Sequence, residues 1–314
     1  MKICFFNLAP KQKEYFQKEL SQHELIFSDQ ALGENNLPEQ NDFDIISVFV
    51  KSNITKKVID YFPNLKMIML RSTGFDNVDL DYAKEKNIVV CNVPVYGSHT
   101  VAEFTFGLIF SLSRHIPQAL AKLKSTRHFD YQNLQGFDLF GKTLGVVGTG
   151  KIGVNVIKIA KVFDMKILAF DIYPNQELSQ QLDFKYVSLD ELLQNADIVT
   201  LHAPSTPQTK HLINQENIFK MKKTAYLINT ARGLLIDTDA LLDALEKKEI
   251  AGVAMDVLEQ ENTLNEAELK LLGMENVLIT PHMAFYTVEA EQSIMKTTLD
   301  NVLNFISGNP KNTV

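Results

Sequence analysis

The sequence predicts an α/β protein with two doubly wound parallel-sheet domains, and three observations support this. The chain has 314 residues, of which 45% are hydrophobic, enough for two cores when one domain takes about 100 to 200 residues. Short runs of β-branched and aromatic residues alternate with helical patterns, as in right-handed βαβ units. The later apolar runs are nearly continuous, which is typical of strands covered by helices on both faces.

The first series of elements occupies the N-terminal part of the chain. We expect strands at residues 2–7, 44–50 and 67–70, with helices near residues 10–21 and 55–61 between them. An apolar stretch follows at residues 101–113, where Phe104, Phe106 and Leu108 stand among other large apolar residues. A helix that is apolar on every side is buried, so this segment suits a domain junction.

The second series predicts six strands, at residues 143–147, 166–170, 197–201, 225–229, 252–257 and 276–280. Residues 287–307 have a helical pattern, and no further strand follows them. We therefore expect this last helix to return to the first domain. The chain has no internal repeat of 20 to 50 residues, so a solenoid is not expected.

Charge and composition limit the classes of partner. The formal charge of −7 disfavours nucleic acid and anionic membranes, because an acidic surface repels both. No apolar run approaches the ~18 residues of a membrane span, and the N-terminal run meets Lys11 too early for a signal peptide. Cys4 and Cys91 are too few for a disulfide framework or a metal cluster, so we expect no metal and a reducing, cytoplasmic location.

A glycine pattern predicts a dinucleotide site. Gly148, Gly150 and Gly153 form G-x-G-x-x-G between an apolar strand and a helix at residues 152–163. In that context Gly148 permits a tight turn, Gly150 permits close approach of a pyrophosphate, and Gly153 permits close helix packing. Lys151 and Ile152 lie in the same turn and are included among the expected cofactor contacts. Three glycines alone are a weak signal, since they can serve a turn without any ligand.

Asp171 strengthens the prediction, because it ends the next strand eighteen residues after Gly153. A carboxylate there accepts hydrogen bonds from the ribose hydroxyls and repels a 2′-phosphate. Ile172 and Tyr173 supply no neighbouring positive charge. NAD is therefore favoured over NADP, and the alternative is that Asp171 only caps a strand or a helix.

Ligands of open α/β sheets bind outside the carboxyl ends of the strands, where this chain has His202, Arg232, Asp256 and His282. The guanidinium of Arg232 can bind a carboxylate and polarise the adjacent carbonyl. The competing interpretation is a surface arginine paired with Asp237 or Asp239.

His282 is suited to proton exchange, since an imidazole ordinarily titrates near neutrality. A carboxylate partner would orient its ring. Glu259 and Glu261 are both candidates, and spacing does not separate them. His202 is the rival proton donor, although the Ala203-Pro204 segment after it is typical of a loop beside a cofactor.

The chain resembles the D-isomer-specific 2-hydroxyacid dehydrogenase family in motifs spread from Met67 to Thr287. These motifs are the glycine loop and five further blocks: Arg71-Ser72-Thr73-Gly74-Phe75-Asp76-Asn77-Val78-Asp79, Asn92-Val93-Pro94-Val95-Tyr96 with Val101-Ala102-Glu103, Thr230-Ala231-Arg232-Gly233, Asp256 through Glu261, and Pro281-His282. Chance explains one such block but not all of them in this order.

The resemblance implies a site and a domain plan. Its catalytic positions are Arg232, Glu261 and His282, so it selects Glu261 where spacing did not. It implies that substrate meets Thr73, Gly74, Tyr96, Arg232 and Phe285, and that the cofactor also meets Ala203, Pro204, Thr209, Thr230, Ala231 and Asp256. It implies a flavodoxin-like substrate domain of residues 1–98 plus 286–314, a Rossmann NAD domain of residues 99–285, a cleft between them, and a homodimer.

The implied reaction is reversible reduction of a small 2-keto acid to its D-2-hydroxy acid. Ala284-Phe285-Tyr286-Thr287 is similar to the same segment of D-lactate dehydrogenases, whereas Arg71-Ser72-Thr73-Gly74 departs from their usual Arg-Asn-Val-Gly. Glyoxylate or hydroxypyruvate reduction and a phosphoglycerate-type activity are alternatives, the last disfavoured because no basic cluster lies near Tyr96. An NAD-sensing interaction protein without turnover is the alternative of another class, and retention of all three catalytic residues opposes it.

Overall fold

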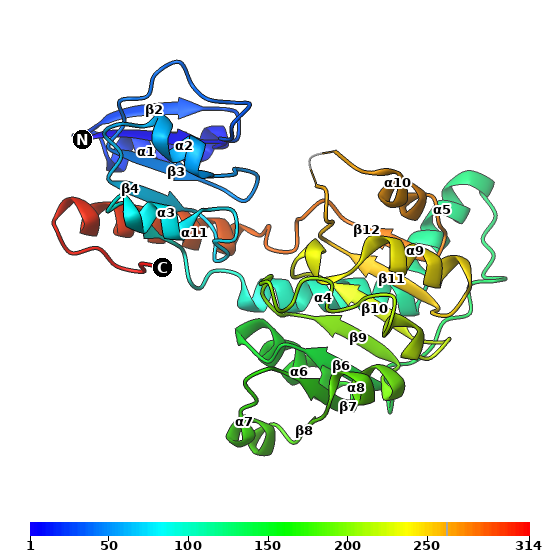
Figure 1. The fold of residues 1–314 in the computed structure, drawn as a ribbon. Helices are drawn as coiled ribbons and strands as arrows, with labels where there is room; N and C mark the ends of the chain where they lie inside the picture. The colour runs from blue at the N-terminus through cyan, green and yellow to red at the C-terminus, as the bar shows by residue number, and fades with distance from the viewer. Residues whose placement is uncertain (262) are drawn as a thin grey trace. The chain divides into compact units, whose positions relative to one another are not determined.

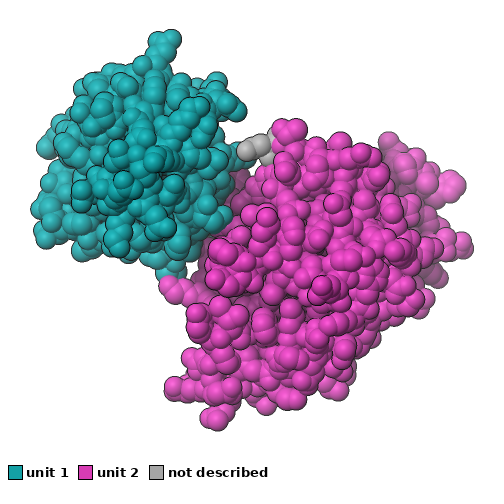
Figure 2. Space-filling view, viewed as in Figure 1, with its two compact units in different colours: residues 1–96, 287–314 teal, residues 97–286 magenta. Residues whose placement is uncertain are grey.

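The computed structural model describes residues 1–261 and 263–314 and divides into two compact units (Figure 1). Unit 1 contains residues 1–96 and 287–314, and unit 2 contains residues 97–286 (Figure 2). Both units are parallel sheets with helices packed on them, as the alternating pattern predicts.

Unit 1 is built on a five-stranded parallel sheet of order β2-β1-β3-β4-β5 within the described residues. This order is that of flavodoxin-like folds. The strands are β1 (Lys2–Phe6), β2 (Glu24–Ser28), β3 (Ile45–Val48), β4 (Met67–Leu70) and β5 (Val89–Cys91). The helices are α1 (Pro10–Glu19), α2 (Lys56–Tyr61), α3 (Leu80–Glu85) and α11 (Val288–Ile306).

Two cores cover the two faces of this sheet. On one face, Phe16 of α1 and Leu299 and Val302 of α11 pack with strand residues such as Ile3 and Met67. On the other face, α2 and α3 pack on the alternate strand residues. The last helix therefore belongs to unit 1, where Thr287 caps it by accepting a hydrogen bond from the backbone N–H of Ala290.

The prediction of three strands in the first series was incomplete, because β2 and β5 belong to the same sheet. β2 is an edge strand whose residues are half-buried or exposed, and β5 has only three residues. Their apolar runs, at residues 25–27 and 88–91, are short, and both strands lie at the edges of the sheet.

Unit 2 is built on a seven-stranded parallel sheet of order β12-β11-β10-β9-β6-β7-β8 in the part of the chain that is described. The six strands predicted from the sequence are β6 (Thr143–Val147), β7 (Lys166–Phe170), β9 (Ile198–Leu201), β10 (Tyr226–Asn229), β11 (Gly252–Met255) and β12 (Val277–Ile279). The prediction omitted β8 (Lys185–Tyr186), an edge strand of two residues. The order reverses between β6 and β9, as in Rossmann folds.

Helices cover both faces of the unit 2 sheet. They are α4 (Ser98–Ser113), α5 (Ile116–Thr126), α6 (Lys151–Val162), α7 (Gln176–Gln181), α8 (Leu189–Asn195), α9 (Thr238–Glu246) and α10 (Glu266–Leu272), with 3₁₀ turns η1 (Ile218–Lys220) and η2 (Gly233–Leu235). One core joins α4 and α6 to the sheet, and a second joins α8 and α9 to its other face. The apolar segment at residues 101–113 is thus a buried helix, as predicted.

Both cysteines are buried free thiols. Burial raises the pKa of Cys4 to about 12 and that of Cys91 to about 11, which keeps both protonated and unreactive at neutral pH. Among the described residues, no helix has the length and apolar character needed to span a membrane. Within residues 1–261 and 263–314, no group of three His, Cys, Asp or Glu side chains could hold a metal ion.

Candidate active site

The glycine loop lies at the point where the strand order of unit 2 reverses, between β6 and α6. Gly148 has φ +93°, and a Cβ there would lie 2.7 Å from the Ala203 nitrogen. A Cβ on Gly153 would lie 2.0 Å from the Gly148 oxygen, so α6 packs directly on the loop. Both positions require glycine on steric grounds.

Gly150 differs from its two neighbours in the motif. It is the N-cap of α6, and a Cβ there would meet nothing within 4 Å. The first N–H groups of a helix lack intrahelical partners and attract anions. Open space before the amides of Lys151, Ile152 and Gly153 therefore fits the diphosphate of a dinucleotide.

Asp171 is braced against the same loop. Its Oδ2 accepts hydrogen bonds from the Thr149 backbone N–H at 2.7 Å and from the Thr149 hydroxyl at 2.9 Å, and its Oδ1 accepts one from the Tyr173 N–H at 2.9 Å. The Thr149 hydroxyl lies 2.7 Å from the Tyr186 hydroxyl. Because the Thr149 hydrogen points to Asp171, Tyr186 is the donor in that pair. Sequence analysis did not identify Thr149 or Tyr186, which come from the loop and from the overlooked strand β8.

The loop after β9 contains His202 and Thr209. Thr209 is buried, and its hydroxyl donates to the Pro204 carbonyl at 2.6 Å and accepts from the Thr206 N–H at 2.8 Å. The Thr209 side chain thus shapes the loop that contains Ala203 and Pro204.

His202 is a poor proton donor in this environment. One ring nitrogen lies 2.9 Å from the Thr200 hydroxyl, while Nδ1 is buried without a hydrogen-bond partner among the described residues. Burial lowers its pKa to about 3, so the ring stays neutral in neutral solution. This weighs against the rival assignment of His202.

Arg232 follows β10 in a turn shaped by Asn229, which is fully buried. The Asn229 side chain accepts from the Ala231 N–H at 3.0 Å and donates to the Arg232 carbonyl at 2.8 Å. Thr230 is buried with its hydroxyl 3.0 Å from that of Thr105 on α4. The turn presents a half-buried Arg232 at the carboxyl end of the sheet, and Asn229 is a third residue whose role the motif alone did not reveal.

His282 and Glu261 form a hydrogen-bonded pair beyond the ends of β11 and β12. The His282 Nδ1 lies 2.8 Å from the Glu261 Oε2. A carboxylate only accepts, so Nδ1 carries the hydrogen and Nε2 remains for proton exchange. His282 has φ +53°, a strained conformation for a histidine, which is common where a backbone is constrained for function. Glu259 has other partners, His211 and Thr238.

Asp256 holds the segment on which His282 lies. Its carboxylate is 1% exposed and accepts hydrogen bonds from the Thr280 hydroxyl at 2.5 Å, the Met283 N–H at 2.9 Å and the Ala284 N–H at 2.8 Å. Burial raises the pKa of Asp256, and these hydrogen bonds oppose the rise. The Phe285 ring lies edge-on to His282, with 6.3 Å between the centroids.

Unit 1 contains the remaining predicted site residues. Arg71 is buried and donates to the carbonyls of Phe6, Asn7 and Ser47, and burial lowers its pKa to about 9. The Thr73 hydroxyl donates to the Val93 carbonyl at 2.8 Å. The backbone N–H groups of Thr73 and Gly74 donate to no other described residue, so both are available to an anion. Tyr96 packs at the margin of the core formed by α1 and α11.

The chain is similar to known dehydrogenases. Residues 106–284 match the family model described as D-isomer specific 2-hydroxyacid dehydrogenase, NAD binding domain. The chain is 39% identical to 2-hydroxyacid dehydrogenase homolog 1 of Schizosaccharomyces pombe, over 98% of this chain and 97% of that protein. It is 37% identical to the D-lactate dehydrogenase of Escherichia coli, over 98% of both chains.

A solved structure shows the same likeness in three dimensions. The D-lactate dehydrogenase of Aquifex aeolicus, complexed with NAD and lactic acid, superposes with a TM-score of 0.91 at 34% identity. The match covers 98% of this chain and 96% of that one. With a family model over more than half of its length and relatives matched from end to end, this chain belongs to the family of NAD-dependent D-isomer-specific 2-hydroxyacid dehydrogenases.

Proposed function

We propose that this dehydrogenase reduces a small 2-keto acid of the pyruvate type to the D-2-hydroxy acid and also catalyses the reverse reaction. The observation that carries the proposal is the 2.8 Å contact between His282 and Glu261 at the strand ends of an NAD-binding unit. In this assignment Arg232, Glu261 and His282 are the catalytic residues.

The roles follow from the hydrogen-bond geometry. Glu261 accepts from Nδ1 of His282, which fixes the orientation of the ring and keeps Nε2 for proton exchange. Nε2 then donates its proton to the carbonyl oxygen as the keto carbon is reduced. Bound NADH supplies the hydride for that carbon. In the direction of oxidation, neutral His282 accepts the hydroxyl proton at the same nitrogen.

Arg232 and the loop at Thr73 are proposed to bind the substrate carboxylate. A guanidinium donates two parallel hydrogen bonds to a carboxylate and polarises a neighbouring carbonyl. The available N–H groups of Thr73 and Gly74 are further donors for an anion. Phe285 beside His282 and Tyr96 are proposed to contact the side chain of the acid, which favours a small apolar group.

The same unit supplies the proposed cofactor contacts. The amides of Gly150, Lys151, Ile152 and Gly153 would face the diphosphate, and Asp171 the adenosine ribose. Ala203, Pro204, Thr209, Thr230, Ala231 and Asp256 complete the proposed set along the sheet edge.

An NADH oxidation assay tests the proposal, using pyruvate, phenylpyruvate, glyoxylate, hydroxypyruvate and 2-ketoisocaproate, with product chirality measured. We expect pyruvate to be preferred and the product to be the D isomer. His282→Ala should lower kcat by about 10²- to 10⁴-fold, the usual cost of losing a general acid, and keep NADH affinity. Lys18→Ala is the control, because that side chain is exposed on α1 in unit 1.

Several outcomes would contradict parts of the proposal. Undiminished turnover by His282→Ala would remove that residue from the chemistry. If the enzyme prefers glyoxylate, hydroxypyruvate or a phosphoglycerate-derived acid, that acid replaces pyruvate as the proposed substrate. Binding of NADH without turnover of any acid would favour an NAD-sensing interaction protein.

We further propose that the protein is a cytoplasmic homodimer. Large apolar side chains are exposed in and after α5, with Phe129 98%, Tyr131 87% and Phe140 74% exposed. Phe140 also lines a surface hollow of about 380 Å³ together with Phe110, Phe137 and Phe163. Exposed apolar surface of this kind is typical of protein contacts. The two free, buried thiols support a reducing compartment.

A further inference from the structure

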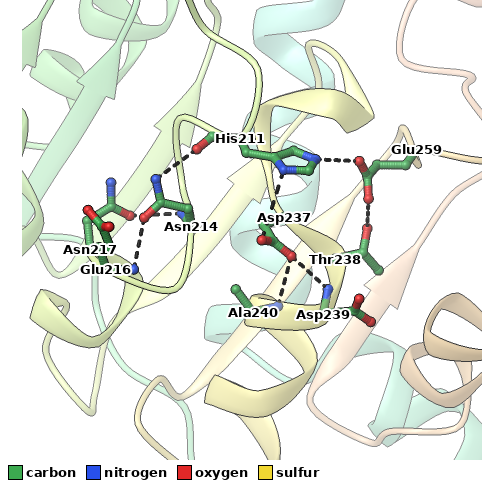
Figure 3. A network of polar contacts seen from close by, with 9 residues as sticks. All are labelled: His211, Asn214, Glu216, Asn217, Asp237, Thr238, Asp239, Ala240 and Glu259. Atoms are coloured by element: carbon green, nitrogen blue, oxygen red, sulfur yellow. Dashed lines mark hydrogen bonds and ion pairs between the residues drawn. The ribbon is translucent and has the colours of Figure 1, made fainter.

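Unit 2 contains a second histidine–carboxylate pair, for which the proposed reaction has no role. His211 Nε2 lies 2.7 Å from the Glu259 Oε1 (Figure 3). Glu259 is only two residues before Glu261 in the chain. The pair is therefore close in sequence to the proposed machinery without being part of it.

Glu259 connects three separate parts of unit 2. Its Oε1 accepts from His211 in the loop after β9, and its Oε2 accepts from the Thr238 hydroxyl at 2.7 Å, at the start of α9. Figure 3 shows both contacts converging on this one side chain. Glu259 itself belongs to the segment between β11 and α10. Both of its oxygens are thus used inside the protein.

His211 is held in turn by its own surroundings. Its N–H donates to the Leu234 carbonyl at 2.8 Å, and its carbonyl accepts from the Asn214 side chain at 3.1 Å. Its Nδ1 lies 4.0 Å from Asp237, the N-cap of α9. His211 is consequently a fixed anchor for Glu259.

The segment before Glu261 is fixed at two further points. A Cβ on Gly233 would lie 2.0 Å from the Leu258 carbonyl carbon, so the turn after Arg232 packs directly on this backbone. The Gln260 N–H donates at 2.9 Å to Glu268, a fully buried carboxylate that also accepts from the Asn265 N–H. Residues 258–260 are therefore held on both sides just before Glu261.

We propose that Glu259 is a positioning residue, which through His211 and Thr238 fixes the backbone that keeps the Glu261 carboxylate on Nδ1 of His282. This inference rests on the proposed roles of Glu261 and His282. A displacement near 1 Å at such a contact can cost about 10²-fold in rate, so an anchor two residues away has a measurable effect. Glu259 touches neither ring nitrogen of His282 and acts only through Glu261.

A double-mutant cycle between Glu259→Ala and Glu261→Gln tests this. We expect Glu259→Ala to lower kcat by about 10-fold or more, because the carboxylate of Glu261 loses its fixed position. The dissociation constant of NADH, measured by fluorescence titration, should stay within about twofold. Glu259→Ala should add little to the loss already caused by Glu261→Gln, since both changes remove the same interaction.

Two matched variants separate positioning from general stability. Glu259→Gln should restore most of the activity, because an amide still accepts from His211 and donates to Thr238. Lys220→Ala removes a 2.7 Å ion pair with Asp190 elsewhere in unit 2 and should leave kcat unchanged. If the loss of kcat in the double variant equals the product of the losses caused by Glu259→Ala and Glu261→Gln separately, the proposal is overturned.

A spectroscopic readout makes the test independent of turnover. The ring N–H of His282 that bonds Glu261 should give a downfield NMR resonance, which Glu261→Gln and Glu259→Ala both shift. If the wild type reduces no keto acid, the proposed function fails, and this resonance still tests the anchor. An unchanged resonance in Glu259→Ala, with a shifted one in Glu261→Gln, would overturn the inference. Thr238→Val removes one of the two hydrogen bonds that anchor Glu259. If Glu259→Ala does not fold, the His282 resonance of Thr238→Val is compared with that of the wild type instead.

Discussion

Burial sets the charge of individual side chains in unit 2, and His202 is the clearest case. Burial lowers the pKa of His202 to about 3, so its imidazole stays neutral at weakly acidic pH. His282, by contrast, has a carboxylate partner at 2.8 Å and is partly accessible. Two histidines at the ends of strands of one sheet are thereby suited to different tasks, packing and proton exchange.

The His202 environment predicts a pH dependence of stability. The pKa of His202 is lower in the folded chain than in the unfolded chain. Its contribution to the free energy of unfolding is therefore complete above about pH 6.5 and is lost progressively toward pH 3. From pH 7 to pH 5 this amounts to about 2 kcal/mol, because the unfolded chain gains a proton that the folded chain does not. We expect His202→Gln to reduce the difference between the unfolding free energies at the two pH values, measured with urea.

The control for this measurement is His99→Gln, which removes an exposed histidine in the first turn of α4. Its pH 7 to pH 5 difference should equal that of the wild type. A His202→Gln variant with the full wild-type difference would show that His202 is readily protonated in the folded protein.

At the scale of elements, the turn from β12 to Phe285 depends on one buried carboxylate. Asp256, just after β11, accepts from one hydroxyl and two backbone N–H groups of residues 280–284. These bonds hold His282 in its left-handed conformation next to Glu261. The position of the proposed acid–base residue is thus set by a neighbouring strand end.

We predict that Asp256→Asn lowers kcat by about 10- to 100-fold, since the new amide N–H₂ opposes the Ala284 N–H and displaces the turn. Steady-state kinetics with the preferred keto acid provide the measurement. Thr280→Val removes only the hydroxyl contact and should have a smaller effect. Equal kinetics of Asp256→Asn and the wild type would mean that the turn holds its shape without this charge.

At the scale of the whole molecule, the exposed apolar residues in and after α5 predict self-association. Light scattering after size exclusion should give twice the chain mass of 35.5 kDa. Phe129→Ser with Phe140→Ser should shift the mass toward that of one chain, because apolar side chains at the centre of a contact carry much of its affinity. Val288→Ser, at an exposed apolar position of α11, is the control. A single-chain mass for the wild type would refute the dimer.

The local pattern of apolar residues was sufficient to predict many of the strands and the buried helix α4. Apolar periodicity identified the inner strands and the buried helix α4, because those segments meet other elements on both sides. It missed β2, β5 and β8, which are short or partly exposed. The glycine loop was visible from sequence for a steric reason, since Gly148 and Gly153 have no room for a side chain.

The sequence by itself determined the alternation of strands and helices, the dinucleotide loop, and the placement of Arg232 and His282 at strand ends, because each depends on residues adjacent in the chain. It left Glu259 and Glu261 equivalent, and only the resemblance preferred one. Tertiary structure decided their partners, with Glu261 on His282 and Glu259 on His211. The physical reason is that each hydrogen bond joins residues 21 or more positions apart, whose proximity arises only when the sheet has formed.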